Sequence, residues 1–160
     1  MIRAAAAEDA GEIGEIYNHY VLRTHITFEE QPLTADAMAQ RMQGSQPRLP
    51  WLVYVEGQEI LGFCYANKWK ERSAYRHCAE STIYLRPDAT GKGIGSRLYH
   101  ALLTALRAHK LHAAIGIVAL PNPASVALHE RLGFVKAGHL REVGWKFDRW
   151  IDVGYWQALL

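Results

Sequence analysis

The chain has 160 residues, of which 49% are hydrophobic and 21% are charged, the composition of an ordinary globular protein. Its 18 Lys and Arg residues against 16 Asp and Glu residues give a net charge of +2, which favours neither nucleic acid nor an anionic membrane as a partner. Two isolated cysteines and the lack of an apolar leader in the opening MIRAAAAEDAGEI predict a cytoplasmic protein with reduced thiols, and no apolar run is long enough to span a bilayer. The length predicts one domain over residues 1–160.

The first half of the chain predicts two helices followed by a hairpin. Apolar residues at helical spacing predict a helix over residues 9–24. Thr34 is placed as the N-cap of a short second helix, with Leu33 and Met38 as a hydrophobic staple. The segments WLVYVE and EILGFCYA are rich in strand formers, so Gly57 and Gln58 between them predict a hairpin turn.

The second half predicts alternating strands and helices. The expected elements are a strand over residues 77–85, a helix from about Ser96, a strand over 113–120, a helix over 123–132 that ends at Gly133, and two strands around FDRW in the tail. This order predicts an α/β (α+β) fold of three layers, in which helices flank a central twisted mixed sheet. A βαβ crossover would place strands 77–85 and 113–120 side by side.

A glycine-rich loop, TGKGIGS, joins the predicted strand 77–85 to the following helix. It is no Walker A loop, because that pattern needs GxxxxGK before Ser or Thr, and Ser96 stands where a dinucleotide fingerprint needs its third glycine. A strand, a glycine turn and a helix N-terminus together present free N–H groups that suit a phosphate. The alternative is a tight turn that binds nothing.

A glutamate in the middle of the strand HCAESTIYL is the first candidate for chemistry. Side chains alternate across a strand, so Cys78, Glu80, Thr82 and Tyr84 share one face. A glutamate in mid-strand needs an explanation, because a buried carboxylate is costly without a partner. Glu80 is therefore either one half of a structural ion pair or a general base that takes a proton from an amine.

Three further segments hold candidate side chains, each with a plainer alternative. The run KWKERSAY contains Lys70 and Arg72, which are either a solvated loop face or a grip for a carboxylate. For Phe28 the plainer interpretation is an ordinary core residue. His129 is either a proton-transfer group or a surface histidine. The pair His109 and His112 lacks further ligands, so no metal site is predicted.

Longer segments carry a resemblance to a known family. LRPDATGKGIGSRLYHAL followed by PNPASVALHERLGF resembles the acyl-CoA-binding core of the GNAT superfamily of N-acetyltransferases, although Thr90 stands where that superfamily usually has Arg or Gln. A narrower likeness, to the phosphinothricin and methionine sulfoximine N-acetyltransferases, covers nearly the whole chain. It is carried by AESTIYL, YANKWKERSAY, LPNPASVALHERLGF and WKFDRWIDVGYWQ.

The resemblance implies acetyl-CoA-dependent acetylation of the amino group of a small amino acid analogue, such as phosphinothricin, methionine sulfoximine or methionine sulfone. It implies Glu80 and His129 as catalytic residues and a homodimer in which WKFDRW approaches the partner's site. The implied acetyl-CoA contacts are Ile83, Tyr84, Leu85, Gly91, Lys92, Gly93, Ile94, Gly95, Ser96, Asn122 and Ser125, and the implied substrate contacts are Phe28, Lys70, Arg72 and Thr82. Two alternatives stay open: an acetyltransferase for a peptide N-terminus or a polyamine, and a non-catalytic acyl-CoA sensor.

Overall fold

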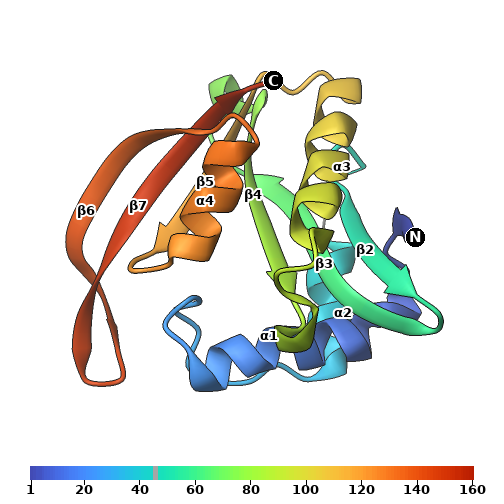
Figure 1. Ribbon diagram of the computed structural model, residues 1–160. Helices are drawn as coiled ribbons and strands as arrows, with labels where there is room; N and C mark the ends of the chain where they lie inside the picture. The colour runs from blue at the N-terminus through green and yellow to red at the C-terminus, as the bar shows by residue number, and fades with distance from the viewer. Residues whose placement is uncertain (45–46) are drawn as a thin grey trace.

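The computed structural model describes residues 1–44 and 47–160, which form a seven-stranded mixed sheet with helices on both faces (Figure 1). The strand order across the sheet is β1-β2-β3-β4-β5-β7-β6. The first half contributes β1 (Ile2–Ala4), α1 (Ala10–Arg23), α2 (Ala35–Gln43), β2 (Trp51–Glu56) and β3 (Glu59–Lys68). The second half contributes β4 (Cys78–Leu85), α3 (Ile94–Ala108), β5 (Ala113–Ala119), α4 (Pro123–Arg131), β6 (Val135–Lys146) and β7 (Arg149–Leu159).

The predicted three-layer architecture is confirmed. One core cluster contains the apolar faces of α1 and α2, packed on β2 and β3. The other contains the apolar face of α3, and side chains of α4 pack against its edge. Helices α1 and α2 therefore cover one face of the sheet and α3 and α4 the other, as Figure 1 shows. Along β4, Ala79 and Ile83 contact the α3 side and Tyr84 contacts the α1 side, which is the predicted alternation.

One strand was not predicted, and one helix begins earlier than expected. Strand β1 was missed, because its three residues are too few to show a period, and only antiparallel pairing with β2 makes them a strand. Helix α3 begins at Ile94 rather than near Ser96, because Gly93 adopts a left-handed conformation with φ of 74° and serves as its N-cap. The loop that was expected to lie before the helix therefore already contains its first turn.

Local signals at two other helix ends are confirmed. The hydroxyl of Thr34 accepts a hydrogen bond from the amide of Ala37, so Thr34 caps α2. Gly133 follows α4 with φ of 88°, and the amide of Phe134 donates to the carbonyl of His129. This is the Schellman pattern, which ends α4 and turns the chain into β6.

Strands β4 and β5 are parallel neighbours, as the crossover predicts, but they pair over a short length only. Their register runs from Cys78 opposite Ala113 to Glu80 opposite Ile115. Beyond Glu80, β4 stays paired with β3 through Leu85, while β5 stays paired with β7 through Ala119. The sheet therefore opens between β4 and β5 beyond Glu80.

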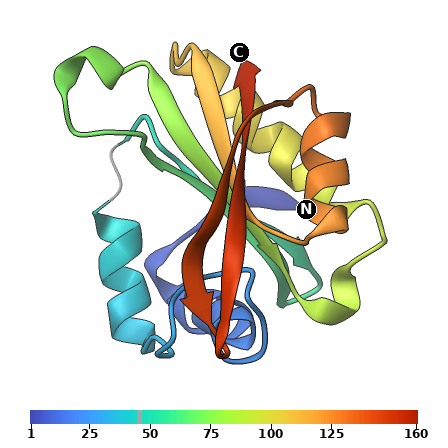
Figure 2. The same ribbon diagram turned by 90° about the vertical axis from the view of Figure 1, so that its left-hand side faces the viewer.

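Strands β6 and β7 form a long twisted hairpin that continues past the end of β5. We call its outer part, residues 144–151, the arm tip. Phe147 and Asp148 form its two-residue turn, both with positive φ, as in a type I′ turn. Figures 1 and 2 both show the arm tip beside the segment that follows α1. In the part of the chain that the structure describes, no helix is long and apolar enough to cross a membrane.

Candidate active site

The opening between β4 and β5 is a narrow cleft that gathers residues from four segments. Six residues with a predicted role line it, namely Thr82, Ile83 and Tyr84 of β4 and Asn122, Ser125 and His129 of the β5–α4 region. Ile26, from the segment after α1, lines it as well. The cleft exists because β4 and β5 lose contact beyond Glu80, which leaves one edge of each strand without a strand partner. Main-chain groups at such an edge are free to bind an extended ligand.

The glycine loop lies at the end of β4 and leads into α3. Gly91 and Gly93 have φ of 75° and 74°, a conformation that favours glycine, and a Cβ atom at either position would meet no heavy atom within 4 Å. Gly93 makes no side-chain cap, so the first amides of α3 remain available. Lys92 is exposed and the hydroxyl of Thr90 donates to the carbonyl of Pro87. The loop therefore presents backbone donors and the positive end of a helix dipole.

Glu80 lies at the last paired position of β4, where the sheet begins to open. Its carboxyl is half-buried, and burial raises its pKa above the ordinary value, an effect that the charge of Lys70 partly offsets. No ion pair within residues 1–44 and 47–160 involves Glu80, so the structural ion-pair interpretation finds no support there. A carboxylate with a raised pKa and no salt-bridge partner is suited to accept a proton.

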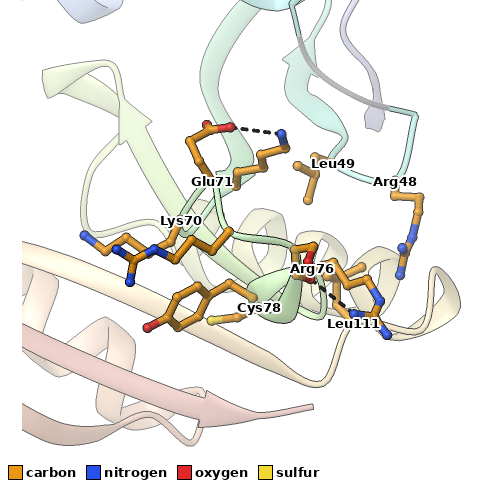
Figure 3. Close-up of a pocket in the computed structure, with 11 residues that line it drawn as sticks. Arg48, Leu49, Lys70, Glu71, Arg76, Cys78 and Leu111 are labelled. Atoms are coloured by element: carbon orange, nitrogen blue, oxygen red, sulfur yellow. Dashed lines mark hydrogen bonds and ion pairs between the residues drawn. The ribbon is translucent and has the colours of Figure 1, made fainter.

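The loop between β3 and β4 carries Lys70 and Arg72 and borders a second cavity, of about 290 Å³ (Figure 3). Lys70 and Arg48 lie on opposite sides of this cavity. Neither Lys70 nor Arg72 lines the β4–β5 cleft, so the two predicted substrate cations belong to a separate cavity at the start of β4. Glu80 lies between the cleft and this cavity: the cleft begins at Glu80, and the charge of Lys70, which borders the cavity, acts on its carboxyl.

Phe28 is 40% exposed and lies in the segment after α1, which we call the Phe28 segment and define as residues 24–30. Thr27 of this segment is buried, and its hydroxyl lies 2.8 Å from that of Tyr17. Ile26 lines the cleft beside Thr82 and Tyr84. The Phe28 segment thus borders the Glu80 face of β4. Phe28 is not a core residue, contrary to the plainer alternative.

His129 is a buried residue rather than a surface histidine. Its Nδ1 lies 2.7 Å from the carbonyl oxygen of Ser125, and its Nε2 lies 3.1 Å from the hydroxyl of Tyr99. A carbonyl can only accept, so Nδ1 carries the proton and Nε2 accepts from Tyr99. Burial lowers the pKa of His129, which keeps the ring neutral at pH 7. The Tyr99 hydroxyl is also 2.7 Å from Oγ of Ser81.

The sequence analysis did not single out three residues around His129. Tyr99 bonds His129 directly, and Ser81 bonds Tyr99. Gly116 was missed too: a Cβ there would lie 2.3 Å from Nε2 of His129. The sequence signal was a tyrosine among the apolar residues of SRLYHALL, because a tyrosine that packs into a core needs a hydrogen-bond partner for its hydroxyl.

Comparison with known proteins identifies the family. Residues 2–154 match the acetyltransferase (GNAT) domain family. The chain belongs to this family. Its GNAT domain is 39% identical over 164 residues to a phosphinothricin N-acetyltransferase of Streptomyces coelicolor, a match that covers 100% of this chain and 96% of the relative.

Two further relatives agree with this result. The GNAT domain is 35% identical over 161 residues to the L-methionine sulfoximine/L-methionine sulfone acetyltransferase of Pseudomonas aeruginosa, covering 99% of this chain and 94% of the relative. A solved GNAT phosphinothricin acetyltransferase of Sinorhizobium meliloti in complex with acetyl-CoA superposes with a TM-score of 0.96 at 35% identity, covering 100% of this chain and 88% of that one. The protein is therefore a GNAT acetyltransferase, and its predicted fold class is confirmed.

Proposed function

We propose that the protein uses acetyl-CoA to acetylate the amino group of a small amino acid analogue such as phosphinothricin, methionine sulfoximine or methionine sulfone. The observation that carries this proposal is the position and the raised pKa of the Glu80 carboxyl. Its half-buried carboxyl has a raised pKa, lies where β4 and β5 part, and stands beside the positive charge of Lys70. The substrate class is supported by two relatives that are named for these substrates and that match this chain over nearly their whole length.

The cleft and the glycine loop fit acetyl-CoA, which supplies an activated acetyl thioester. The main chain of Ile83, Tyr84 and Leu85 would pair with its pantetheine arm, although the Leu85 carbonyl already accepts from the Tyr20 hydroxyl at 2.5 Å. Asn122 and Ser125 would hold the opposite side of the arm. The amides of Gly91, Lys92, Gly93, Ile94, Gly95 and Ser96 would hold the pyrophosphate, since open left-handed glycines let phosphate oxygens approach the backbone.

Glu80 would prepare the amine for reaction. A substrate ammonium must lose a proton before its nitrogen can attack a carbonyl carbon, and at pH 7 most of it is protonated. Glu80 would take that proton directly or through one water. The amine nitrogen would then form a bond to the thioester carbonyl carbon, the carbon–sulfur bond would break, and coenzyme A would leave as thiolate or thiol. Holding the amine and the thioester together supplies much of the remaining rate, so the scheme uses no covalent acyl-enzyme and no metal.

Four residues would hold the amino acid analogue. Arg72 would bind its carboxylate through two parallel hydrogen bonds, and Lys70 would add positive charge on the same loop. Phe28 and Thr82 would contact the remainder of the substrate, since the Phe28 segment borders the Thr82 face of β4. The cationic β3–β4 loop disfavours a polyamine, because like charges repel.

His129 is proposed to take part in proton transfer together with Tyr99. Replacement of His129 by Gln keeps a polar side chain but removes the imidazole, which can gain or lose a proton. We therefore expect His129→Gln to lower kcat roughly tenfold. The imidazole of His129 is neutral at pH 7, which is the form proposed to be active. Protonation of the ring at low pH removes the hydrogen-bond acceptor at Nε2. The pKa of His129 is lowered, so its loss should alter the acid limb of the pH–rate profile. An unchanged rate and profile would restrict His129 to packing.

The backbone cradle is tested at Gly93. A β-branched residue resists positive φ, so Gly93→Val should weaken acetyl-CoA binding at least ~10-fold, about 1.4 kcal/mol, in a calorimetric titration. Thr90→Ala should cost less, and Lys92→Ala should cost a small, salt-dependent amount. Gly57→Val is the matched control, because Gly57 has φ of 63° in a distant hairpin. Normal binding by Gly93→Val, or a larger loss at Thr90, would contradict the cradle.

Release of free thiol from acetyl-CoA across a panel of amines tests the proposed function directly. The panel should contain phosphinothricin, methionine sulfoximine, methionine sulfone, a peptide with a free N-terminus and a polyamine. We expect rapid release with the first three. Preference for the peptide or the polyamine would replace the substrate class, and tight acetyl-CoA binding without release by any amine would make the protein a sensor.

We also propose that residues 1–160 form one domain and that the protein is a cytoplasmic homodimer. Both cysteines are free, which suits a reducing compartment. The arm tip exposes the rings of Trp145 and Trp150 by 50% and 60%, which suits burial against a second copy. A monomer mass in analytical ultracentrifugation would contradict the homodimer. Two separate thermal transitions would contradict the single domain, and recovery outside the cytoplasmic fraction would contradict the location.

A further inference from the structure

Lys146, the last residue of β6, is buried in the arm tip although it carries a charge. Its side chain is 2% exposed, and its ammonium donates to the carbonyl oxygens of Thr27 and Glu29 at 2.8 Å each. These two carbonyls stand on either side of Phe28 in the chain. One ammonium therefore fixes the backbone on both sides of a residue proposed to contact the substrate.

Two further contacts join the arm tip to the Phe28 segment. Gly144 leaves room for the Phe28 ring, because a Cβ there would lie 2.3 Å from Cζ of Phe28. The guanidinium of Arg149 lies 2.9 Å from Nδ1 of His25, and Nε2 of His25 lies 2.9 Å from the carbonyl oxygen of Pro121. The Phe28 segment thus bridges the arm tip and the β5–α4 loop (Figures 1 and 2).

The opposite side of the Phe28 segment is held by α1 and α2. The Tyr17 hydroxyl donates to the carboxylate of Glu29, and Arg41 forms an ion pair with the same carboxylate. These bonds fix the Glu29 side chain. The arm holds the two backbone carbonyls that flank Phe28, those of Thr27 and Glu29, through Lys146.

Packing alone does not account for a lysine at this position. Burying an ammonium is costly unless it is fully hydrogen-bonded, and an apolar residue of the same length would fill the space without that cost. An apolar residue would offer no donor to either carbonyl, however. What the ammonium adds is therefore a defined position for the backbone at Thr27 and Glu29.

We propose that Lys146 is a positioning residue for the amine substrate: through its two backbone hydrogen bonds it holds the backbone on both sides of Phe28, in the segment whose Ile26 lines the cleft with Thr82 and Tyr84. The inference rests on the proposed function for its kinetic consequence, but the contact itself is independent of catalysis. Lys146 does not touch the cleft that would take acetyl-CoA. Its loss should therefore affect the amine and spare the cosubstrate.

The test is Lys146→Met, which keeps length and apolar packing but removes the donors. We expect KM for the best amine to rise about tenfold, with kcat and the Kd for acetyl-CoA changed by less than about twofold. Lys136→Met, an exposed lysine on the same strand, is the matched control and should change neither constant. A fall in kcat at unchanged KM, or an equal loss of acetyl-CoA affinity, would overturn the proposal.

A double-mutant cycle asks whether Lys146 acts through Phe28. If it does, Lys146→Met should raise KM far less in a Phe28→Ala background than in the wild type, because coupled residues are not additive. Equal factors in both backgrounds would overturn the proposed route.

Hydrogen exchange separates failure of this inference from failure of the proposed function. Amides of the Phe28 segment should exchange faster in Lys146→Met, whether or not any amine is acetylated, while those of α3 should be unchanged. Unchanged exchange in the segment would overturn the contact. If Lys146→Met does not fold, Arg149→Ala removes the neighbouring contact to His25 and should raise KM for the amine about threefold. No change in Arg149→Ala would then reject the role of the arm.

Discussion

Replacing Glu80 by Gln is expected to lower kcat roughly 100-fold or more and to leave acetyl-CoA affinity nearly unchanged. The amide keeps the shape of the carboxyl but cannot accept a proton from an ammonium. Glu80 begins the opening between β4 and β5 without lining the part of it proposed for acetyl-CoA, so binding of acetyl-CoA should survive. Stopped-flow detection of thiol release and calorimetric titration measure the two quantities separately.

The pH dependence of kcat/KM gives the same prediction a second readout. Burial raises the pKa of Glu80, so the carboxyl stays protonated, and unable to act as a base, up to a higher pH than an exposed glutamate. Activity should therefore fall as pH falls through this raised pKa, and Glu80→Gln should lose that limb. Glu71→Gln is the matched control, since Glu71 is an exposed carboxylate in the β3–β4 loop. Wild-type turnover by Glu80→Gln at neutral pH would refute the assignment.

Local sequence patterns predicted most of the secondary structure, because their causes are local. Thr34 caps α2 through its own hydroxyl, and Gly133 ends α4 because it readily adopts positive φ. Alternation along β4 likewise placed Glu80 and Tyr84 on one face. Strand β1 shows the limit of this approach, since its three residues form a strand only through their pairing with β2.

The candidate site was predictable only in part, because its remaining features depend on contacts between distant segments. The spacing of Lys70 and Arg72 gave no sign that they border a cavity other than the β4–β5 cleft. Likewise, Lys146 sits in a run of exposed residues in the tail, yet it is buried against the Phe28 segment 117 residues earlier in the chain. Such contacts follow from tertiary packing, for which a single sequence carries no periodic signal.

The two cations of the β3–β4 loop, Lys70 and Arg72, border the same cavity but are suited to different roles. Burial raises the pKa of the Glu80 carboxyl, and the charge of Lys70 offsets part of that rise. Arg72 starts a short turn at Ser73–Tyr75, and its exposed guanidinium is free to extend toward a ligand. Lys70 is therefore suited to tune the base, and Arg72 is suited to bind the substrate carboxylate.

Replacing Arg72 by Ala is therefore expected to reduce kcat/KM for the amino acid analogue by about 2–5 kcal/mol, mostly through KM. The guanidinium would bind the α-carboxylate in a bidentate manner, which no neighbouring side chain replaces. Esterifying that carboxylate should then weaken the wild type far more than Arg72→Ala, because the variant has already lost the contact. Arg76→Ala is the matched control, since Arg76 lines the same cavity but donates to the carbonyl of Ser73. Equal losses on esterification in the wild type and in Arg72→Ala would reject the contact and leave Lys70 as the other cation predicted to bind the substrate.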